Sequence, residues 1–204
     1  MRFEREIMGR VVRVLTLLVL TVGALEARAQ NLVQNGDFSG GLGVWSIIPG
    51  GNYSVSWDGA VGNNAAGAVF INLTIASAGT EAYFASQCVP VLASATYDVS
   101  GSFMFPSSVG TTPTSSIVVQ AFSDAGCTTS AGSLAGFGIS ILASPPNTWH
   151  RQDYIGGYLT PATAAAVKVY LLFRTPAAGL ASGWFDDINF SKTLPVELQQ
   201  FSID

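Results

Sequence analysis

The feature that most constrains the fold is the near absence of helical periodicity after residue 30. Short runs rich in valine, isoleucine, phenylalanine, tyrosine and threonine recur between clusters of glycine, proline, serine and asparagine, which is typical of all-β proteins. We predict about nine or ten strands, of which the clearest are 53–57, 68–75, 81–89, 95–105, 116–123, 149–159, 165–173 and 183–190. Strands in this number favour an all-β fold, a two-sheet antiparallel β-sandwich of the jelly-roll type.

Residue alternation predicts which side chains form the core. In the segment 95–105 it places Asp98, Ser100 and Ser102 on the face opposite a run of larger apolar residues, so that one face packs and the other is wet. Linkers are expected at 106–114 and at 144–147, where consecutive prolines exclude a central strand. Phe38 and Trp45 are assigned to the core, whereas the face that Trp184 occupies is left open.

The first 29 residues have the three parts of an export signal: several arginines, an apolar run at 14–25, and Ala27-Arg28-Ala29 before a cleavage point. The apolar run is shorter than the roughly 20 residues that a membrane-spanning helix needs. We therefore predict three parts: a signal peptide at 1–29, a sandwich domain at 30–192 and a strand-like tail at 193–204. The expected location is outside the cell or at its surface, with the periplasm as an alternative.

Charge excludes two classes of partner. The chain carries 9 basic and 13 acidic residues. Its basic residues after the signal are dispersed: Arg151, Lys168, Arg174 and Lys192. Because no basic run or patch is present, nucleic acid and anionic membranes are poor partners, and no segment is long and apolar enough for a membrane span.

The two cysteines, Cys88 and Cys127, are an even count in a chain predicted to be exported, which favours a disulfide over a metal or redox site.

Three segments, in their order and spacing, carry a resemblance to a known family. These are NLVQNGDFSGGLGVW at the start, CVPVLASATYDVSGSFMF with VVQAFSDAGC in the middle, and AAVKVYLLF followed by GWFDDINF near the end. Together they resemble the carbohydrate-binding modules of the galactose-binding-like jelly-roll kind that are appended to bacterial cellulases and xylanases. The resemblance covers most of the chain after the signal and implies a noncatalytic, exported glycan-binding module.

The resemblance also implies a structural calcium ion where the first strand meets the closing one. Asp186 or Asp187 would be a ligand, with Asp37 as a substitute for the acidic residue that the family commonly has at the position of Ser39. Adjacent residues on a strand point to opposite faces, so only one aspartate of the pair is expected to reach a given site. The alternative is that the pair caps loops by accepting backbone N–H groups.

Glycan-binding modules stack sugar rings on exposed aromatic side chains and bind the hydroxyls with amides and carboxylates. The candidates with polar neighbours in sequence are Tyr53, Trp57, Trp149, Tyr154 and Tyr158. Each of them alone is better explained by ordinary core or rim packing, since aromatic residues dominate the cores of β-sandwiches.

Catalysis has little support in the sequence. The one histidine, His150, is not accompanied by a GxSxG nucleophile motif, so a Ser-His-Asp triad has no support. The two adjacent aspartates are expected to point to opposite faces, so they would not form the carboxylate pair of a glycoside hydrolase. We therefore predict no enzyme. The leading prediction is a glycan-binding module whose partner is a polysaccharide or a cell-surface glycan. The alternative is a structural or adhesive extracellular protein of the same fold with a protein or matrix partner.

Overall fold

The computed structural model describes residues 29–50, 52–75, 81–106, 114–140, 145–174 and 179–193, and these contain ten strands and no helix. The predicted signal peptide and the predicted tail therefore lie almost wholly outside the described residues. The strands are β1 (Ser46–Ile47), β2 (Tyr53–Asp58), β3 (Ala68–Ile75), β4 (Glu81–Pro90), β5 (Thr96–Met104), β6 (Thr114–Phe122), β7 (Ala135–Ser140), β8 (His150–Leu159), β9 (Ala166–Arg174) and β10 (Gly179–Lys192).

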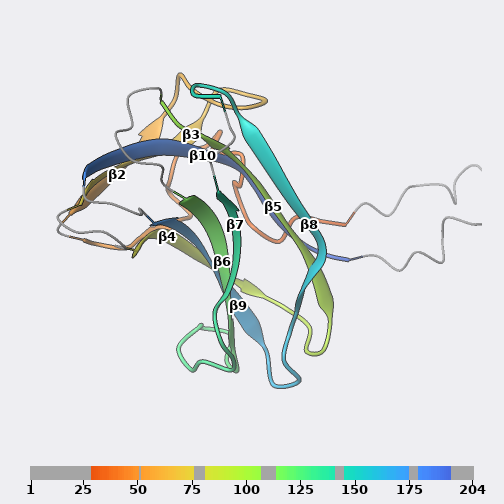
Figure 1. Ribbon diagram of the computed structural model, residues 1–204. Helices are drawn as coiled ribbons and strands as arrows, with labels where there is room; N and C mark the ends of the chain where they lie inside the picture. The colour runs from red at the N-terminus through yellow and green to blue at the C-terminus, as the bar shows by residue number, and fades with distance from the viewer. Residues whose placement is uncertain are drawn as a thin grey trace, which may run out of the picture.

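The strands form two antiparallel sheets of five, which confirms the predicted all-β sandwich. We call them sheet A, in the order β2-β3-β10-β5-β8, and sheet B, in the order β1-β4-β9-β6-β7. Figure 1 shows them as two layers, with β2, β3 and β10 above β4, β6 and β9. All eight of the clearest predicted strands are present, and β1 and β7 are additional. No helix among the described residues could cross a membrane.

Aromatic residues dominate the core between the sheets. Phe84 and Phe173 of sheet B meet Phe103 and Phe185 of sheet A, and Phe173 lies 4.9 Å from Phe185 between ring centroids. Each of these side chains is almost completely buried. Pairs in such tilted and edge-to-face geometries stabilise a core beyond the apolar area that they bury.

The core assignment of Phe38 and Trp45 is confirmed, since both are buried and their rings lie 5.3 Å apart. One detail of the alternation is wrong. Ser100 and Ser102 face away from the core as predicted, yet both are buried rather than exposed to solvent. Arg151 of β8 donates to the Ser100 hydroxyl, and Asn63 of the β2–β3 loop donates to that of Ser102, so polar neighbours cover this outer face.

The segment before β1 completes sheet A beside the end of β10. The Leu32 N–H donates to the Phe190 carbonyl, and the Ile188 N–H donates to the Gly36 carbonyl. This pairing brings the two ends of the described chain side by side. Gly36 is required at the contact, because a Cβ at this position would collide with the Ile188 carbonyl oxygen.

We expect Gly36→Ala to lower the free energy of unfolding by about 3 kcal/mol, the upper part of the usual cost of overpacking, since a backbone atom cannot rotate away as a side chain can. Chemical denaturation measures the loss. Gly43→Ala is the matched control, because a Cβ there meets nothing within 4 Å. Equal stability of the two variants would contradict the close pairing of this segment with β10.

Candidate functional site

A β-bulge places both aspartates of the closing strand on one face. Phe185 and Ile188 both point into the core, so the two residues between them, Asp186 and Asp187, both face outward from sheet A. The register of β10 against β5 shifts at this point, and Asp187 has a positive φ of 50°. The expectation that the pair splays to opposite faces is therefore wrong, because the bulge interrupts the two-residue period of the strand.

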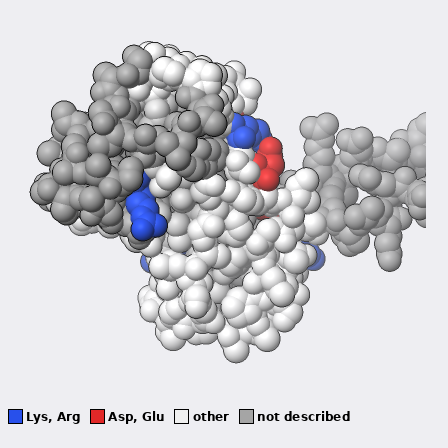
Figure 2. All heavy atoms as spheres, viewed as in Figure 1, with Lys and Arg blue, Asp and Glu red and all other residues white. Residues whose placement is uncertain are grey.

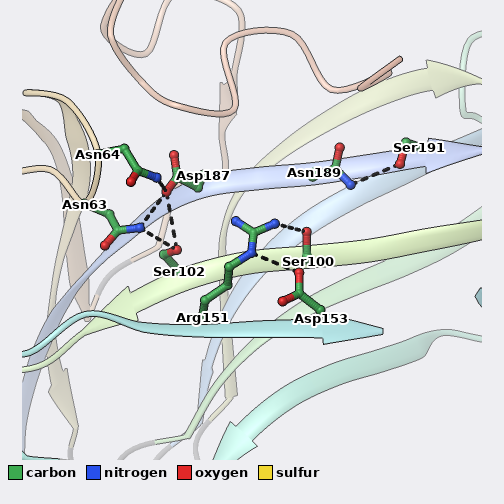
Figure 3. Close-up of polar contacts among 9 residues, drawn as sticks. All are labelled: Asn63, Asn64, Ser100, Ser102, Arg151, Asp153, Asp187, Asn189 and Ser191. Atoms are coloured by element: carbon green, nitrogen blue, oxygen red, sulfur yellow. Dashed lines mark hydrogen bonds and ion pairs between the residues drawn. The ribbon is translucent and has the colours of Figure 1, made fainter. Parts of the chain in front are cut away.

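One residue of the β2–β3 loop joins the two carboxylates. The Asn63 backbone N–H donates to Asp186 Oδ2 at 2.6 Å, and its side-chain amide donates to Asp187 Oδ2 at 2.7 Å. Asn64 donates to the same Asp187 oxygen, as Figure 3 shows. Asp186 is buried, and its second oxygen accepts the Asp187 backbone N–H. The pair thus accepts backbone and amide N–H groups, as the alternative interpretation predicts.

Asp37 lies close enough to add its charge to this corner of sheet A. Burial is the largest cause that raises the pKa of Asp186, to about 6, and the negative charges of Asp187 and Asp37 raise it further. An open cleft of about 430 Å³ borders the same corner, lined by polar groups that include Asn31, Asn35, Asp37, Asn64, Arg151 and Asp187. The three predicted metal ligands therefore lie in one region of the molecule, where the first segment joins the closing strand.

The donor chemistry of this corner fits a hard cation. Carboxylate, amide and carbonyl oxygens are the ligands that Ca²⁺ prefers, and in the described part of the chain no lysine or arginine pairs with the three aspartates. The described residues hold no ready cluster of three or more histidine, cysteine or acidic side chains around a point. A cation here would thus take much of its coordination from carbonyl and amide oxygens.

The predicted aromatic platforms do not lie together. Tyr53 and Trp57 are on β2, whereas Tyr154 and Tyr158 are on β8, with Trp149 just before it. These strands are the two opposite edges of sheet A. Four strand spacings separate them, about 19 Å, so the five rings form no common groove.

Their contacts also differ. Tyr158 is 6% exposed and packs in the core, which leaves no ring face for a ligand and corrects its assignment as a platform. Tyr53 and Tyr154 are half-buried against the core, and their hydroxyls donate to backbone carbonyls. Trp57 is 47% exposed and donates its indole N–H to the Phe38 carbonyl. Trp149 is half-buried.

Trp184 occupies the outer face of sheet A. It lies 4.9 Å from Phe70 between ring centroids and donates to Asp58. The next residue, Phe185, is the one that enters the core.

A second aromatic group lies on the outer face of sheet B, on residues that sequence reasoning missed. Tyr83 of β4 and Tyr170 of β9 meet edge to face, with ring centroids 5.4 Å apart. Both are half-buried. Burial first, and then the neighbouring Tyr83, raises the pKa of Tyr170 above the ordinary value of a tyrosine.

Polar groups from neighbouring strands flank this pair. Tyr170 donates its hydroxyl to the Gln120 side-chain carbonyl of β6 at 3.2 Å, and Gln120 donates its amide to Ser130. Lys168, directly opposite Gln120 in the register, lies two residues before Tyr170 on the same face. We call Tyr83, Gln120, Lys168 and Tyr170 the sheet B platform.

The disulfide borders the sheet B platform. Cys88 and Cys127 are bonded, as predicted, at a Cα separation of 6.1 Å. Cys88 is the register partner of Lys168 on β4, and Cys127 belongs to the turn that follows β6. The covalent bond therefore ties this turn to the strand beside the platform.

Part of the sheet B platform could have been predicted from the sequence. In 165–173 the apolar residues Val167, Val169 and Leu171 alternate with Lys168 and Tyr170, which places the last two on an outer face. The missing information was the register across strands, since it alone shows that Tyr83 and Gln120 lie beside Tyr170.

Solved structures share this architecture. A family 16 carbohydrate-binding module-2 is 20% identical with a TM-score of 0.52, and the match covers 78% of this chain and 99% of that one. TmCBM61, solved in complex with β-1,4-galactotriose, is 15% identical with a TM-score of 0.53, over 80% of this chain and 99% of that one. The fold is that of a carbohydrate-binding module.

The carbohydrate-binding-module fold also occurs as part of an enzyme. An arabinose-bound α-L-arabinofuranosidase is 16% identical with a TM-score of 0.58, and the match covers 79% of this chain but 26% of that one. No protein-family model and no curated protein matches the sequence. These likenesses establish the fold, and the ligand has to be argued from the surface of this chain.

Proposed function

We propose that this chain is a noncatalytic glycan-binding protein that works outside the cell. The observation that carries the proposal is the sheet B platform, where two tyrosine rings lie beside an amide on one face of the sandwich. Ring faces suit the CH face of a pyranose, and a side-chain amide suits its hydroxyls. Neighbours of the same fold include a module solved with a galactotriose, which supports this class of ligand.

The polar groups of sheet A do not favour catalysis. Glycoside hydrolysis needs two carboxyl groups that are free to reach the scissile bond. Although Asp186 and Asp187 share a face, both oxygens of the buried Asp186 accept backbone N–H groups. The His150 ring contacts the Pro145 carbonyl at 3.5 Å rather than the hydroxyl or thiol of a nucleophile. The predicted export signal and the disulfide support a location outside the cytoplasm.

A pull-down with insoluble polysaccharides and a glycan array, using the chain after residue 29, tests the proposal. We expect retention on at least one polysaccharide and competition by its soluble oligosaccharide. Folded protein that binds no glycan would overturn the proposal and favour the structural or adhesive alternative.

The second part of the proposal is a structural Ca²⁺ at the corner of Asp37, Asp186 and Asp187. These carboxylates would hold the ion together with nearby carbonyl and amide oxygens, and the ion would neutralise the charge that raises the pKa of Asp186. It would fasten the first segment to the closing strand.

Proton and calcium should compete at this corner. A carboxyl whose folded pKa is raised, here to about 6, favours its protonated form in the fold. Its contribution to stability is therefore complete at low pH and is lost as the pH rises from about 4 through about 6. We expect Ca²⁺ at about 100 times its Kd to raise the free energy of unfolding by about 3 kcal/mol at pH 7, and by less at pH 5.

Thermal unfolding with calcium or with a chelator, at both pH values, measures this effect. Mg²⁺ is the control cation, because its demand for tight octahedral coordination suits such a corner less well. Asp37→Asn should weaken the calcium response. An identical response in that variant and in the unchanged chain would contradict the assignment of Asp37.

A further inference from the structure

Lys168 is a cation on the sheet B platform that binding of a neutral sugar does not use. Its Nζ lies 5.2 Å from the ring centroid of Phe122 and 6.0 Å from that of Tyr170. Such cation–π contacts hold an ammonium group in place over the rings. No carboxylate among the described residues forms an ion pair with Lys168.

Most acidic residues of the described chain lie on the other side of the sandwich, although Glu81 of β4 belongs to sheet B and is the register partner of Arg174. Among the described residues, the strands of sheet A and the loop before β1 carry Asp37, Asp58, Asp98, Asp153, Asp186 and Asp187. Asp124, in the turn after β6, uses both carboxylate oxygens to accept N–H groups of its own turn, from Gly126, Thr128 and Thr129. In Figure 2 the part of the surface that is not grey is mostly uncharged, and at one place a basic and an acidic group lie side by side. Of the two basic residues on β9, Lys168 lies at the platform, whereas Arg174 ends the strand opposite Glu81 of β4.

We propose that the ligand of the sheet B platform is an acidic glycan, a polysaccharide whose sugar rings carry carboxylates, and that Lys168 pairs with one of these groups. This inference rests on the proposed function and names the class of its ligand. The sugar would lie against the Tyr170 ring beside the Lys168 ammonium, which covers part of that ring. Gln120 keeps one N–H and one lone pair for a hydroxyl, because its bonds to Tyr170 and Ser130 use only one of each.

A neutral sugar fits this arrangement less well. Covering Lys168 with an uncharged ring would remove water from the ammonium group without replacing it by a charge, and that desolvation is costly. A sugar carboxylate repays this cost with a charge-assisted hydrogen bond. Because the ammonium is already held over two rings, less conformational entropy is lost on pairing than for a free lysine side chain.

Affinity measurements with matched polysaccharides test the inference. The acidic probes are polygalacturonate, alginate and a glucuronate-substituted xylan, and the neutral probes are methyl-esterified polygalacturonate, galactan and unsubstituted xylan. We expect tighter binding to an acidic probe than to any neutral one, with an affinity that falls as sodium chloride is raised from about 50 to 500 mM. Lys168→Gln should weaken that binding roughly tenfold, the equivalent of one charge-assisted bond.

Lys192→Gln is the control, because Lys192 lies at the end of β10 in sheet A, away from this platform. It should leave the affinity for the acidic probe unchanged. Binding to neutral probes only, or acidic binding that Lys168→Gln does not alter, would overturn the inference and leave the proposed function standing. Absence of binding to every probe would overturn both.

Discussion

Replacement of both Cys88 and Cys127 by alanine should lower the free energy of unfolding by about 4 kcal/mol. The bond closes a loop across 39 positions of sequence. In the chain-entropy model, a loop of this length gives that stabilisation by restricting the unfolded chain. For a domain of this size the midpoint of thermal unfolding should fall by about 8 to 16 °C.

Denaturant unfolding of the oxidised chain and of the double alanine variant measures this loss. The variant should also unfold with a larger denaturant dependence, because its unfolded state is less compact. A reducing agent provides the control: it should destabilise the unchanged chain by a similar amount and leave the variant unaffected. A loss below about 1 kcal/mol would show that the turn after β6 is held mainly by its other contacts.

Those other contacts are local. Asp124 accepts N–H groups of Gly126, Thr128 and Thr129, which also lowers the pKa of its carboxyl, with the bond from Thr129 as the largest cause. Without the disulfide the turn should therefore keep its shape but lose its fixed position beside β4. Because Ser130 accepts the Gln120 amide, we expect the platform to lose order together with the turn.

Most of the strands could be predicted from the sequence, because strand-forming composition and alternation are properties of short stretches of chain. The eight segments predicted as the clearest strands are all strands in the structure, whereas β1 has only two residues and β7 contains two glycines, so neither shows a readable pattern. Burial on the outer faces could not be read in the same way. Ser100 and Ser102 are buried by Arg151 and Asn63, which lie far from them in sequence.

The candidate site was predicted only in part, for the same physical reason. Asp37, Asp186 and Asp187 could be placed together because a resemblance supplied their position, but the bulge that turns both aspartates outward leaves no mark in the residue pattern. Aromatic residues near polar ones in sequence proved to lie on opposite edges of sheet A. Cross-strand register decides which side chains share a surface, and it follows from the whole packed structure rather than from any one segment.

Tyr170→Ala should weaken glycan binding about 30-fold or more, the cost expected when a central aromatic residue of a binding surface is removed. The substitution removes the ring that meets Tyr83, lies near Lys168 and donates to Gln120. Tyr170→Phe keeps the ring and should lose only the bond to Gln120, so its affinity should fall by a few-fold at most. Isothermal titration with the polysaccharide retained in the pull-down measures both.

Trp57→Ala distinguishes a glycan-binding site on sheet A from one on sheet B. Trp57 is the most exposed of the five predicted aromatic residues, since the other four are half-buried or buried, and it lies at the β2 edge of sheet A. If the sheet B platform binds the sugar, Trp57→Ala should bind as the unchanged chain does, once thermal unfolding has shown that the variant is folded. The reverse pattern, in which Trp57→Ala abolishes binding and Tyr170→Ala does not, would move the site to the edge of sheet A. Since the two sheets present opposite faces of one sandwich, a single pair of variants decides between them.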